Sequence, residues 1–173
     1  MHDERLANLL GAASLAVTDL VRAGTTAAGG VSASGAAALI VLSGAPGLSV
    51  TELGRRVGLT QSAAARMVDG LQDAGLARRR PGGGRAVEVR LTAQGEDAAR
   101  RVLTARGAPL AEALAVLDDG ERAALTAVLG KLLARLYEAI GDSDVMCRLC
   151  DRRCCTEGAV CPVGQAERDA GGA

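Results

Sequence analysis

The fold is decided in the stretch 48–91, which has the sequence LSVTELGRRVGLTQSAAARMVDGLQDAGLARRRPGGGRAVEVRL. It opens with Ser49–Glu52, the S-x-x-E spacing of a capping box, in which a hydroxyl and a carboxylate satisfy free N–H groups at a helix start. The short helix that follows is expected to end at Gly58, because glycine readily adopts the left-handed C-cap conformation. Thr60 can cap a second helix that begins at Gln61. The spacing therefore predicts a helix-turn-helix.

The second helix and the segment after it extend this pattern. The positions of the second helix that are expected to face the core are Ala64, Met67, Val68 and Leu71. Two extended runs, 76–80 and 87–91, follow Gly75, and Pro81, three glycines and Arg85 lie between them. Alternating apolar residues indicate a half-buried strand, and proline with glycine indicates a hairpin tip. A helix-turn-helix followed by a basic β-hairpin is a winged helix, so the predicted fold is mainly α with a small β-hairpin wing.

Three runs of residues in this stretch occur in a recognisable order. They are T-E-L-G-x-x-V-G-L-T-x-S from Thr51, V-D-G-L-x-x-A-G-L-x-x-R-R from Val68, and G-R-A-x-x-V-x-L-T-x-x-G from Gly84. This order resembles the MarR (multiple antibiotic resistance regulator) family, over about residues 5–140. The resemblance implies a homodimer of winged helices with interlocked terminal helices. It also implies binding to pseudo-palindromic duplex DNA, usually as a repressor released by a ligand or by oxidation.

The wing carries both a match to the family and a departure from it. Arg85 corresponds to the family's wing-tip arginine, which the resemblance implies to be a DNA contact. Gly83 stands where the family commonly has an acidic residue, two positions before that arginine. The departure implies a wing that is looser before DNA arrives.

Composition and charge fit a single helical domain that binds duplex DNA. With 173 residues the chain has the length of about one domain with a substantial core. It has no Phe or Trp and a single Tyr, which disfavours recognition of single strands by base stacking. The net charge is zero, yet residues 51–106 hold eleven arginines against six acidic residues. Such local clustering of positive charge is expected of a DNA-binding domain.

The N-terminal residues predict two helices separated by a loop. Residues 3–23 carry apolar side chains at helical spacing, which fits a dimerisation helix, as the resemblance implies, and a core helix equally well. The segment 24–30 (GTTAAGG) is expected to be a loop. Ser32 or Ser34 can cap the next apolar helix, which is expected to end within 43–47.

The residues after the wing predict two further long helices. Thr92 can cap the first, and a kink or break is expected at 107–109, because Pro109 lacks an N–H group. A cap at 118–121 precedes a last helix that ends near Ile140, whose wide apolar face indicates a homodimer. The predicted organisation is a winged-helix domain at 1–141, with a DNA-binding core at 33–92 and dimerisation helices at 3–23 and 93–140, followed by a cysteine-rich tail at 142–173.

The second helix of the motif is predicted to lie in the major groove. Its outward residues include Gln61 and Arg66, which suit adenine and guanine respectively. Arg85 is predicted to reach the minor groove and residues 78–80 to contact phosphates, although the outward residues of the second helix and residues 78–80 could instead be solvated. The predicted DNA-contacting residues are Gln61, Ser62, Ala63, Arg66, Arg78, Arg79, Arg80 and Arg85, with Arg55 and Arg56 as weaker candidates. A dimer would place its half-sites about 10 bp apart.

All five cysteines lie in the tail. They are Cys147, Cys150, Cys154, Cys155 and Cys161. Cys-x2-Cys is a usual half of a zinc site, and the compact run that ends in Cys-Pro is also similar to iron–sulfur ligation. The arginines at 148, 152 and 153 favour the thiolate, which helps metal binding and oxidation alike. Three alternatives stay open: a zinc or iron–sulfur site that uses one of the two adjacent cysteines, a thiol redox switch, and an inert tail.

Other classes of protein fit the sequence poorly. His2 is the only histidine, and the glycines at 82–84 lack the lysine of a phosphate-binding loop, so no enzyme is expected. No apolar run is expected to reach membrane-spanning length, and the first residues do not resemble a secretory signal, which predicts a cytoplasmic protein. The resemblance adds a small-molecule effector as a possible partner. The alternative function is a thiol or iron–sulfur redox protein that uses the winged helix as an interaction scaffold.

Overall fold

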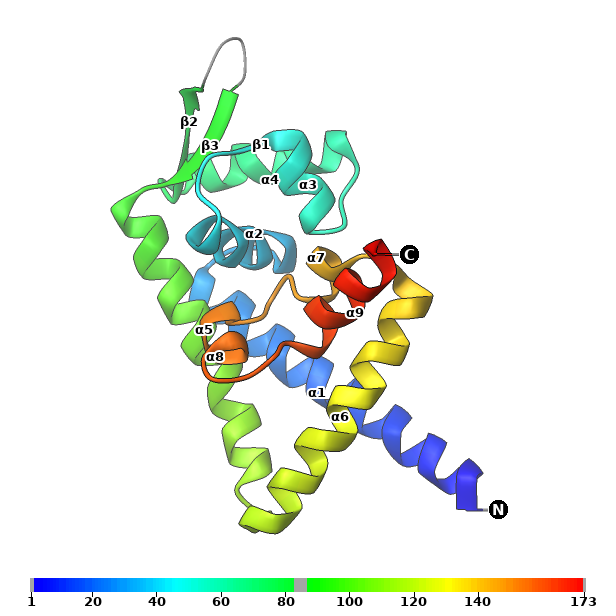
Figure 1. Cartoon of the computed structure of the whole chain (residues 1–173). Helices are drawn as coiled ribbons and strands as arrows, with labels where there is room; N and C mark the ends of the chain where they lie inside the picture. The colour runs from blue at the N-terminus through cyan, green and yellow to red at the C-terminus, as the bar shows by residue number, and fades with distance from the viewer. Residues whose placement is uncertain (1, 83–86, 173) are drawn as a thin grey trace.

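The computed structural model describes residues 2–82 and 87–172. These residues form helices around a small three-stranded sheet (Figure 1). The helices are α1 (His2–Gly29), α2 (Ala33–Gly44), α3 (Val50–Arg56), α4 (Gln61–Asp73), α5 (Ala93–Leu114), α6 (Asp119–Ile140), α7 (Ser143–Met146), α8 (Arg152–Thr156) and α9 (Pro162–Gly171). The strands are β1 (Leu48–Ser49), β2 (Ala77–Pro81) and β3 (Val87–Leu91).

The sheet is antiparallel, with the order β1-β3-β2. β2 and β3 form the wing, in a register that pairs Ala77 with Leu91 and Pro81 with Val87. β1, which sequence reasoning had treated only as a helix cap, pairs with the other edge of β3 through Leu48 and Val89. The predicted fold class, mainly α with a small β-hairpin wing, is confirmed. The predicted wing-tip residue Arg85 lies outside the described residues.

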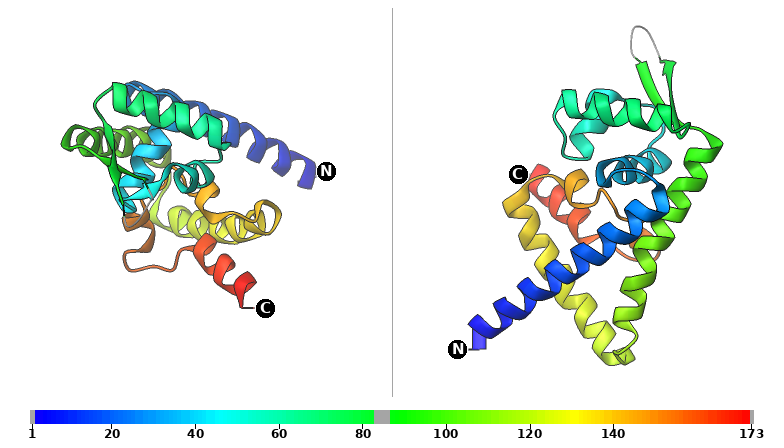
Figure 2. Two further views of the ribbon diagram at one scale, coloured as in Figure 1. Left: turned by 90° about the horizontal axis from the view of Figure 1, so that it is seen from above. Right: turned by 180° about the vertical axis from the view of Figure 1, so that it is seen from behind.

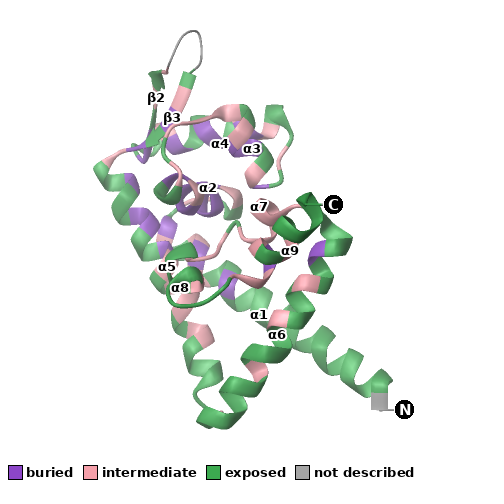
Figure 3. Ribbon diagram, in the orientation of Figure 1, coloured by how far each residue is buried: buried purple, intermediate pink, exposed green. Residues whose placement is uncertain are grey.

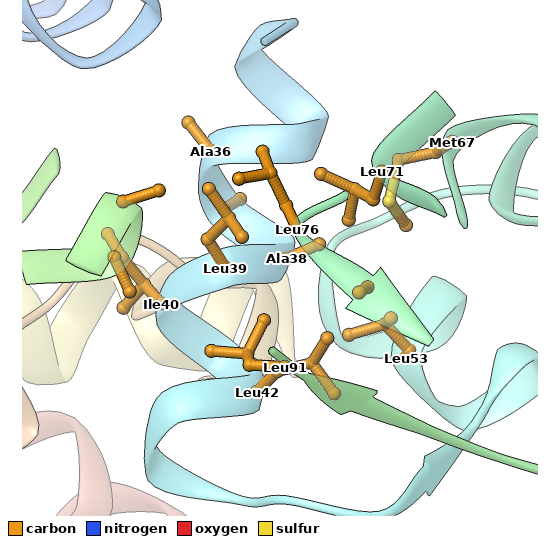
Figure 4. Close-up of a cluster of buried hydrophobic side chains, with 14 of the residues drawn as sticks. Ala36, Ala38, Leu39, Ile40, Leu42, Leu53, Met67, Leu71, Leu76 and Leu91 are labelled. Atoms are coloured by element: carbon orange, nitrogen blue, oxygen red, sulfur yellow. The ribbon is translucent and has the colours of Figure 1, made fainter. Parts of the chain in front are cut away.

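The core lies between α2, the helix-turn-helix and the start of α5 (Figure 4). Leu39 and Leu42 of α2, Leu53 of α3 and Leu71 of α4 are almost fully buried, and Val102 of α5 is buried against the same cluster. Alanine is the other main component of this core, which allows helices to approach closely where aromatic rings would keep them apart. The four positions of α4 predicted to face inward are all buried.

The predicted helix caps form at both helices of the motif. Ser49 Oγ accepts a hydrogen bond from the Glu52 N–H group at 3.1 Å, and Thr60 Oγ1 accepts one from the Ala63 N–H group. Gly58 adopts φ +74°, as expected for the glycine that ends the first helix. The Glu52 carboxylate of the predicted capping box instead accepts hydrogen bonds from the arginines that follow it in α3.

The loop predicted at 24–30 is wrong, and of the kink or break predicted at 107–109 the break does not occur. α1 continues to Gly29, and α5 continues through Pro109. The two helices pack together at these points: a Cβ on Gly24 would lie 2.8 Å from the Ala105 carbonyl oxygen. In a regular helix that carbonyl oxygen would accept a hydrogen bond from the N–H group of residue 109, which proline lacks. Both residues therefore belong to a helix crossing, where a glycine allows close approach.

The continuous α1 also corrects the expectation about apolar length. Its residues 3–29 are long and apolar enough to cross a membrane, judged by length and composition alone, a test that core helices of soluble proteins also pass. Residues 3–20 are exposed along the whole projecting part of the helix (Figures 2 and 3). Its C-terminal part packs against α2 and α5 instead.

The remaining helices form an open V. α5 and α6 are its two arms, α1 crosses it on one side, and the C-terminal segment lies across it on the other (Figures 1 and 2). Within that segment, α7 packs against α3 and α6, and α9 packs against α6. Residues 142–172 are therefore in contact with the helix-turn-helix.

Candidate DNA-binding surface and cysteine tail

The helix α4 presents a polar face to solvent over its first two turns. Gln61, Ser62 and Arg66 are exposed there, and Ala63 is partly buried. No ion pair is recorded for Arg66 within the part of the chain that the structure describes. The opposite face is anchored in the core by Val68. This arrangement leaves the four predicted groove-facing residues at the start of a helix that is rigidly held from behind.

The position of α4 depends on a close contact with α3. A Cβ placed on Gly54 of α3 would lie 2.5 Å from the Cβ of Ala64 in α4. Only glycine at this position allows the two helices to pack at the observed separation. The turn between them is closed by a hydrogen bond of 2.8 Å from the Leu59 N–H group to the Gly54 carbonyl oxygen.

The side chains of the three arginines of β2 do not all face the same side of the strand. Arg79 pairs with Asp69 of α4 at 2.7 Å and also donates to Gln72, so it ties the wing to α4. Arg78 and Arg80 alternate with it along the strand and are exposed. Sequence reasoning grouped these three residues together, whereas the structure gives Arg79 partners inside the protein.

Arg55 and Arg56, the weaker candidates for phosphate contact, bind the tail. Arg55 donates to Asp144 at 2.7 Å and to Asp142 at 3.2 Å, and Arg56 lies 3.6 Å from Asp144. Both arginines also contact Glu52, and hydrogen bonds from them lower the pKa of that carboxyl to about 2. Sequence reasoning missed this cluster, because the acidic residues lie about 90 positions away in the chain.

Apolar contacts support the same attachment. The Val145 side chain lies 3.7 Å from the position that a Cβ on Gly58 would occupy, so α7 touches the turn that precedes α4. Leu149 packs against the main core. Arg152 donates to Asp144 at 2.6 Å, which links the second half of the tail to the same carboxylate. The tail is thus held to the helix-turn-helix by one acidic centre and two apolar side chains.

The five cysteines are free thiols and differ in exposure. Cys154 is exposed, and its Sγ donates to Asp151 Oδ2 at 3.3 Å, whereas the other four are partly buried. A hydrogen bond from the Cys147 thiol, with smaller contributions from Arg106 and Arg152, lowers the pKa of Cys150 to about 6 despite burial. The Arg106 Nη2 atom lies 4.0 Å from the Cys150 sulfur. The same hydrogen bond and burial raise the pKa of Cys147.

These thiols do not yet stand in a metal-ligating arrangement. Among residues 2–82 and 87–172, no three histidine, cysteine, aspartate or glutamate side chains are placed to hold a metal ion together. Cys147 and Cys150 lie at the two ends of one turn, which is closed by a hydrogen bond of 2.9 Å from the Cys150 N–H group to the Cys147 carbonyl oxygen. The structure therefore brings two of the predicted tail residues to neighbouring positions.

A cavity of about 550 Å³ lies between α2, α5 and the tail. Its apolar wall includes Ile40 and Leu103, and Cys147 and Cys150 line it on the tail side. The charged residues around it are Arg56, Arg100, Arg152, Arg153 and Asp151. Positive charge in excess over an apolar wall suits an organic anion. The family resemblance implies a pocket between the dimerisation helices and the winged helix, but no sequence signal predicted that the tail would line it.

The fold and the exposed recognition helix define a winged-helix transcription regulator. The MarR family model matches residues 29–86. The structure is similar to the MarR family protein RV2887 from Mycobacterium tuberculosis, with 30% identity over 75% of this chain and 95% of that chain and a TM-score of 0.61. The chain belongs to the MarR family.

Other solved structures agree. A MarR family regulator from Silicibacter pomeroyi is 31% identical, with 69% of this chain and 84% of that chain covered and a TM-score of 0.54. The YusO protein from Bacillus subtilis shares the fold at 23% identity, with 76% and 96% covered and a TM-score of 0.66. RV2887 also appears in complex with salicylic acid, at 31% identity over 71% and 95%, with a TM-score of 0.53. No match was found among curated protein sequences.

Proposed function

We propose that this MarR family regulator binds a pseudo-palindromic duplex site as a homodimer and represses transcription. The observation that carries the proposal is α4, whose polar first turns are exposed while its apolar face is buried. A helix held in this way can enter the major groove without rearrangement. The alternative, a redox protein that uses the winged helix only as a scaffold, gives no reason for this exposed polar face.

Two unpartnered apolar surfaces support the homodimer. The projecting part of α1 exposes Leu6, Leu9 and Leu15, with exposed fractions between 55% and 71%. α6 exposes a second stripe, which consists of Val128, Leu129, Leu132, Leu133, Leu136 and Ile140. Exposed apolar surface on this scale is costly for a lone soluble chain. A second copy of the chain would cover both stripes, as interlocked terminal helices do in the family.

The proposed contacts divide into base-reading and positioning groups. Gln61, Ser62, Ala63 and Arg66 would meet base edges in the major groove. Arg78 and Arg80 would contact phosphates, and Arg85 would enter the minor groove. We assign Arg79 to a shared role, because its pairing with Asp69 orients the wing relative to α4. DNA binding and free thiols together favour the cytoplasm as the site of action.

The test compares two arginine variants of the full-length protein on DNA from the promoter of its own gene. Arg66→Ala should cost about 1–3 kcal/mol in specific binding, a loss of roughly 5- to 150-fold, because it removes a two-pronged base contact. Arg122→Ala is the matched control, since it removes the same charge from the first turn of α6, at the opposite end of the molecule (Figure 1). It should leave the affinity nearly unchanged. Equal effects of the two variants would contradict base reading by α4.

We further propose that an organic anion is the effector and binds the arginine-rimmed cavity. Salicylic acid binds RV2887, and a carboxylate on an aromatic ring has the chemistry that this cavity suits. Salicylate is therefore the probe, added to the preformed protein–DNA complex. Release of DNA by salicylate, weakened in Arg153→Ala, supports the proposal. Salicylate release that persists unchanged in that variant would move the effector site elsewhere.

The cysteine tail is proposed to modulate DNA binding, through a bound metal or through thiol oxidation. Its attachment to α3 by Arg55 and Asp144 supports such a link, because a change in the tail would reach the helix-turn-helix directly. The two chemistries make different demands on the thiols. A metal site needs four of them together, whereas a redox switch needs only one pair.

A further inference from the structure

The tail has very little apolar core to hold it folded. α7 has four residues and α8 has five, and neither contains a buried residue. Val163 of α9 is the only buried apolar side chain in the described part of the tail. Helices this short do not persist alone, and small units without a core usually depend on disulfides or a metal ion. The cysteines are free thiols, so a metal ion that they bind together would supply such stabilisation.

The backbone brings two of the thiols to neighbouring positions and leaves a third uncommitted. The Cys150 N–H group donates to the Cys147 carbonyl oxygen at 2.9 Å, which closes a turn with both thiols on neighbouring positions. Cys161 begins α9 without a side-chain cap hydrogen bond, so its sulfur is not committed to the helix end. Cys155 lies in α8 and is partly buried.

Cys154 is the exception among the five. It is the only exposed cysteine, and its thiol donates to the Asp151 carboxylate at 3.3 Å. The other four are partly buried. Cys154 is therefore the one thiol that is turned towards solvent and a carboxylate, which leaves the other four for a common ligand.

We propose that Cys147, Cys150, Cys155 and Cys161 bind one Zn²⁺ ion as four thiolates and that Cys154 takes no part. The resulting pattern, Cys-x2-Cys-x4-Cys-x5-Cys, provides the four sulfur ligands of a closed structural zinc site. The thiols are not at ligating positions in the described conformation, so zinc binding would draw the four thiols together and release their protons. Arg106 and Arg152 would offset the two negative charges of the loaded site.

The zinc site would act on DNA binding through Asp144, three residues before Cys147. Asp144 accepts from Arg55 of α3, and the adjacent Val145 touches Gly58 in the turn before α4. A loaded site would fix α7 in this position, and loss of zinc would free it. This regulatory step rests on the proposed DNA-binding function, whereas the zinc site itself does not.

The experiment uses the full-length protein and two neighbouring serine variants. Purified chains are stripped with chelator under reducing conditions, and zinc is titrated back, with Co²⁺ as a spectroscopic probe of thiolate number and tetrahedral geometry. Wild type and Cys154→Ser should bind one ion per chain with four-thiolate spectra. Cys155→Ser should lower the zinc affinity by more than about 100-fold, which is a larger loss than removing a residue that only hydrogen-bonds a zinc ligand would cause. Circular dichroism of the stripped variants verifies that the winged helix remains folded.

Three results would overturn the zinc assignment. The first is loss of binding in Cys154→Ser with retention in Cys155→Ser. The second is no stoichiometric zinc in wild type, including the case in which mass spectrometry finds a Cys147–Cys150 disulfide. The third is an iron–sulfur absorption band from protein isolated without air.

DNA affinity measured with and without zinc distinguishes failure of the regulatory step from failure of the zinc site or of the proposed DNA-binding function. A weaker affinity of the stripped protein, restored by zinc, supports the regulatory step, and unchanged affinity overturns that step alone. If no specific DNA is bound in either state while zinc binds as expected, the proposed function fails and the zinc site stands. If DNA is bound but zinc is not, the zinc site fails and the function stands.

Discussion

The contact between α3 and α4 gives a sharp prediction, because it depends on the absence of one methyl group. In Gly54→Ala the new Cβ would lie 2.5 Å from the Ala64 Cβ. Carbon atoms in contact rest at about 3.5–4.0 Å, so the two helices would have to separate by about 1 Å. Ala64 belongs to the first turns of α4, which carry the proposed groove-facing residues. The substitution should therefore disturb both stability and DNA binding.

The expected change in the free energy of unfolding of Gly54→Ala is the balance of two opposing effects. Overpacking a tight site costs about 1–3 kcal/mol, whereas replacing a helical glycine by alanine gains about 0.5–1 kcal/mol. A net loss of roughly 0.5–2 kcal/mol is expected, which for a chain of this length lowers the Tm by about 1–8 °C. Gly70→Ala is the matched control, since Gly70 is also helical and has nothing within 4 Å of its Cβ position. That variant should be slightly more stable than wild type.

The assay is thermal unfolding followed by circular dichroism, together with DNA affinity. The double variant Gly54→Ala/Ala64→Gly removes the overlap, at a cost of about 1 kcal/mol for a second helical glycine. It should therefore be more stable than the sum of the two single variants predicts, with a coupling energy of at least about 0.5 kcal/mol. If Gly54→Ala is as stable as Gly70→Ala, or if the double variant is strictly additive, this account of the α3–α4 contact is wrong.

Three further predictions concern the dimer, the tail and its ion pairs. Leu136→Asp should weaken self-association by about 100-fold or more, because it buries an unpaired charge in the proposed interface; analytical ultracentrifugation that still finds a dimer at low concentration would refute this. Asp144→Ala should speed proteolytic cleavage of the tail, whereas Asp97→Ala, which breaks only a surface pair, should not. The folded pKa of Glu52 is about 2, so any stability that this carboxylate provides should be complete above about pH 5 and lost as the pH falls through 4.5 towards 2. An NMR titration should find the pKa of Glu52 nearer 4.5 in Arg55→Ala. An unchanged pKa would refute the pairing of Arg55 with Glu52.

The winged helix could be predicted from the sequence, because its determinants are local. A hydroxyl at the position before each helix and a glycine after it mark boundaries that the structure reproduces at Thr60 and Gly58. The same local rules failed at Gly24 and Pro109. There the packing of α1 on α5 decided the outcome, since a continuous helix buries more surface than a loop. Both residues predict a break, but Gly24 allows the close approach of α5, and Pro109 lacks the N–H group that would donate to the Ala105 carbonyl oxygen beside Gly24.

Some features of the candidate site could likewise be predicted from the sequence, and others could not. The exposure of Gln61 and Arg66 followed from helical periodicity, which also identified the buried face of α4. The attachment of Arg55 to Asp144 did not, because it joins residues 89 positions apart by charge alone. Sequence spacing also left Cys154 and Cys155 equivalent. Only the fold of the tail, which turns one thiol towards Asp151, distinguishes them.

The helix α6 contacts the tail on one side and exposes its leucine stripe on another, which explains how a folded tail and a dimer can coexist. α9 packs along a side of α6 made mainly of small residues, and the cavity between them is lined by Thr126, Gly130, Ala134 and Tyr137. The leucine stripe of the same helix lies on other positions and stays exposed. A folded tail would therefore not compete with a partner chain for the same surface. It follows that zinc would regulate DNA binding through α7 and α3, with the dimer intact, so stripped protein should remain dimeric while its DNA affinity changes.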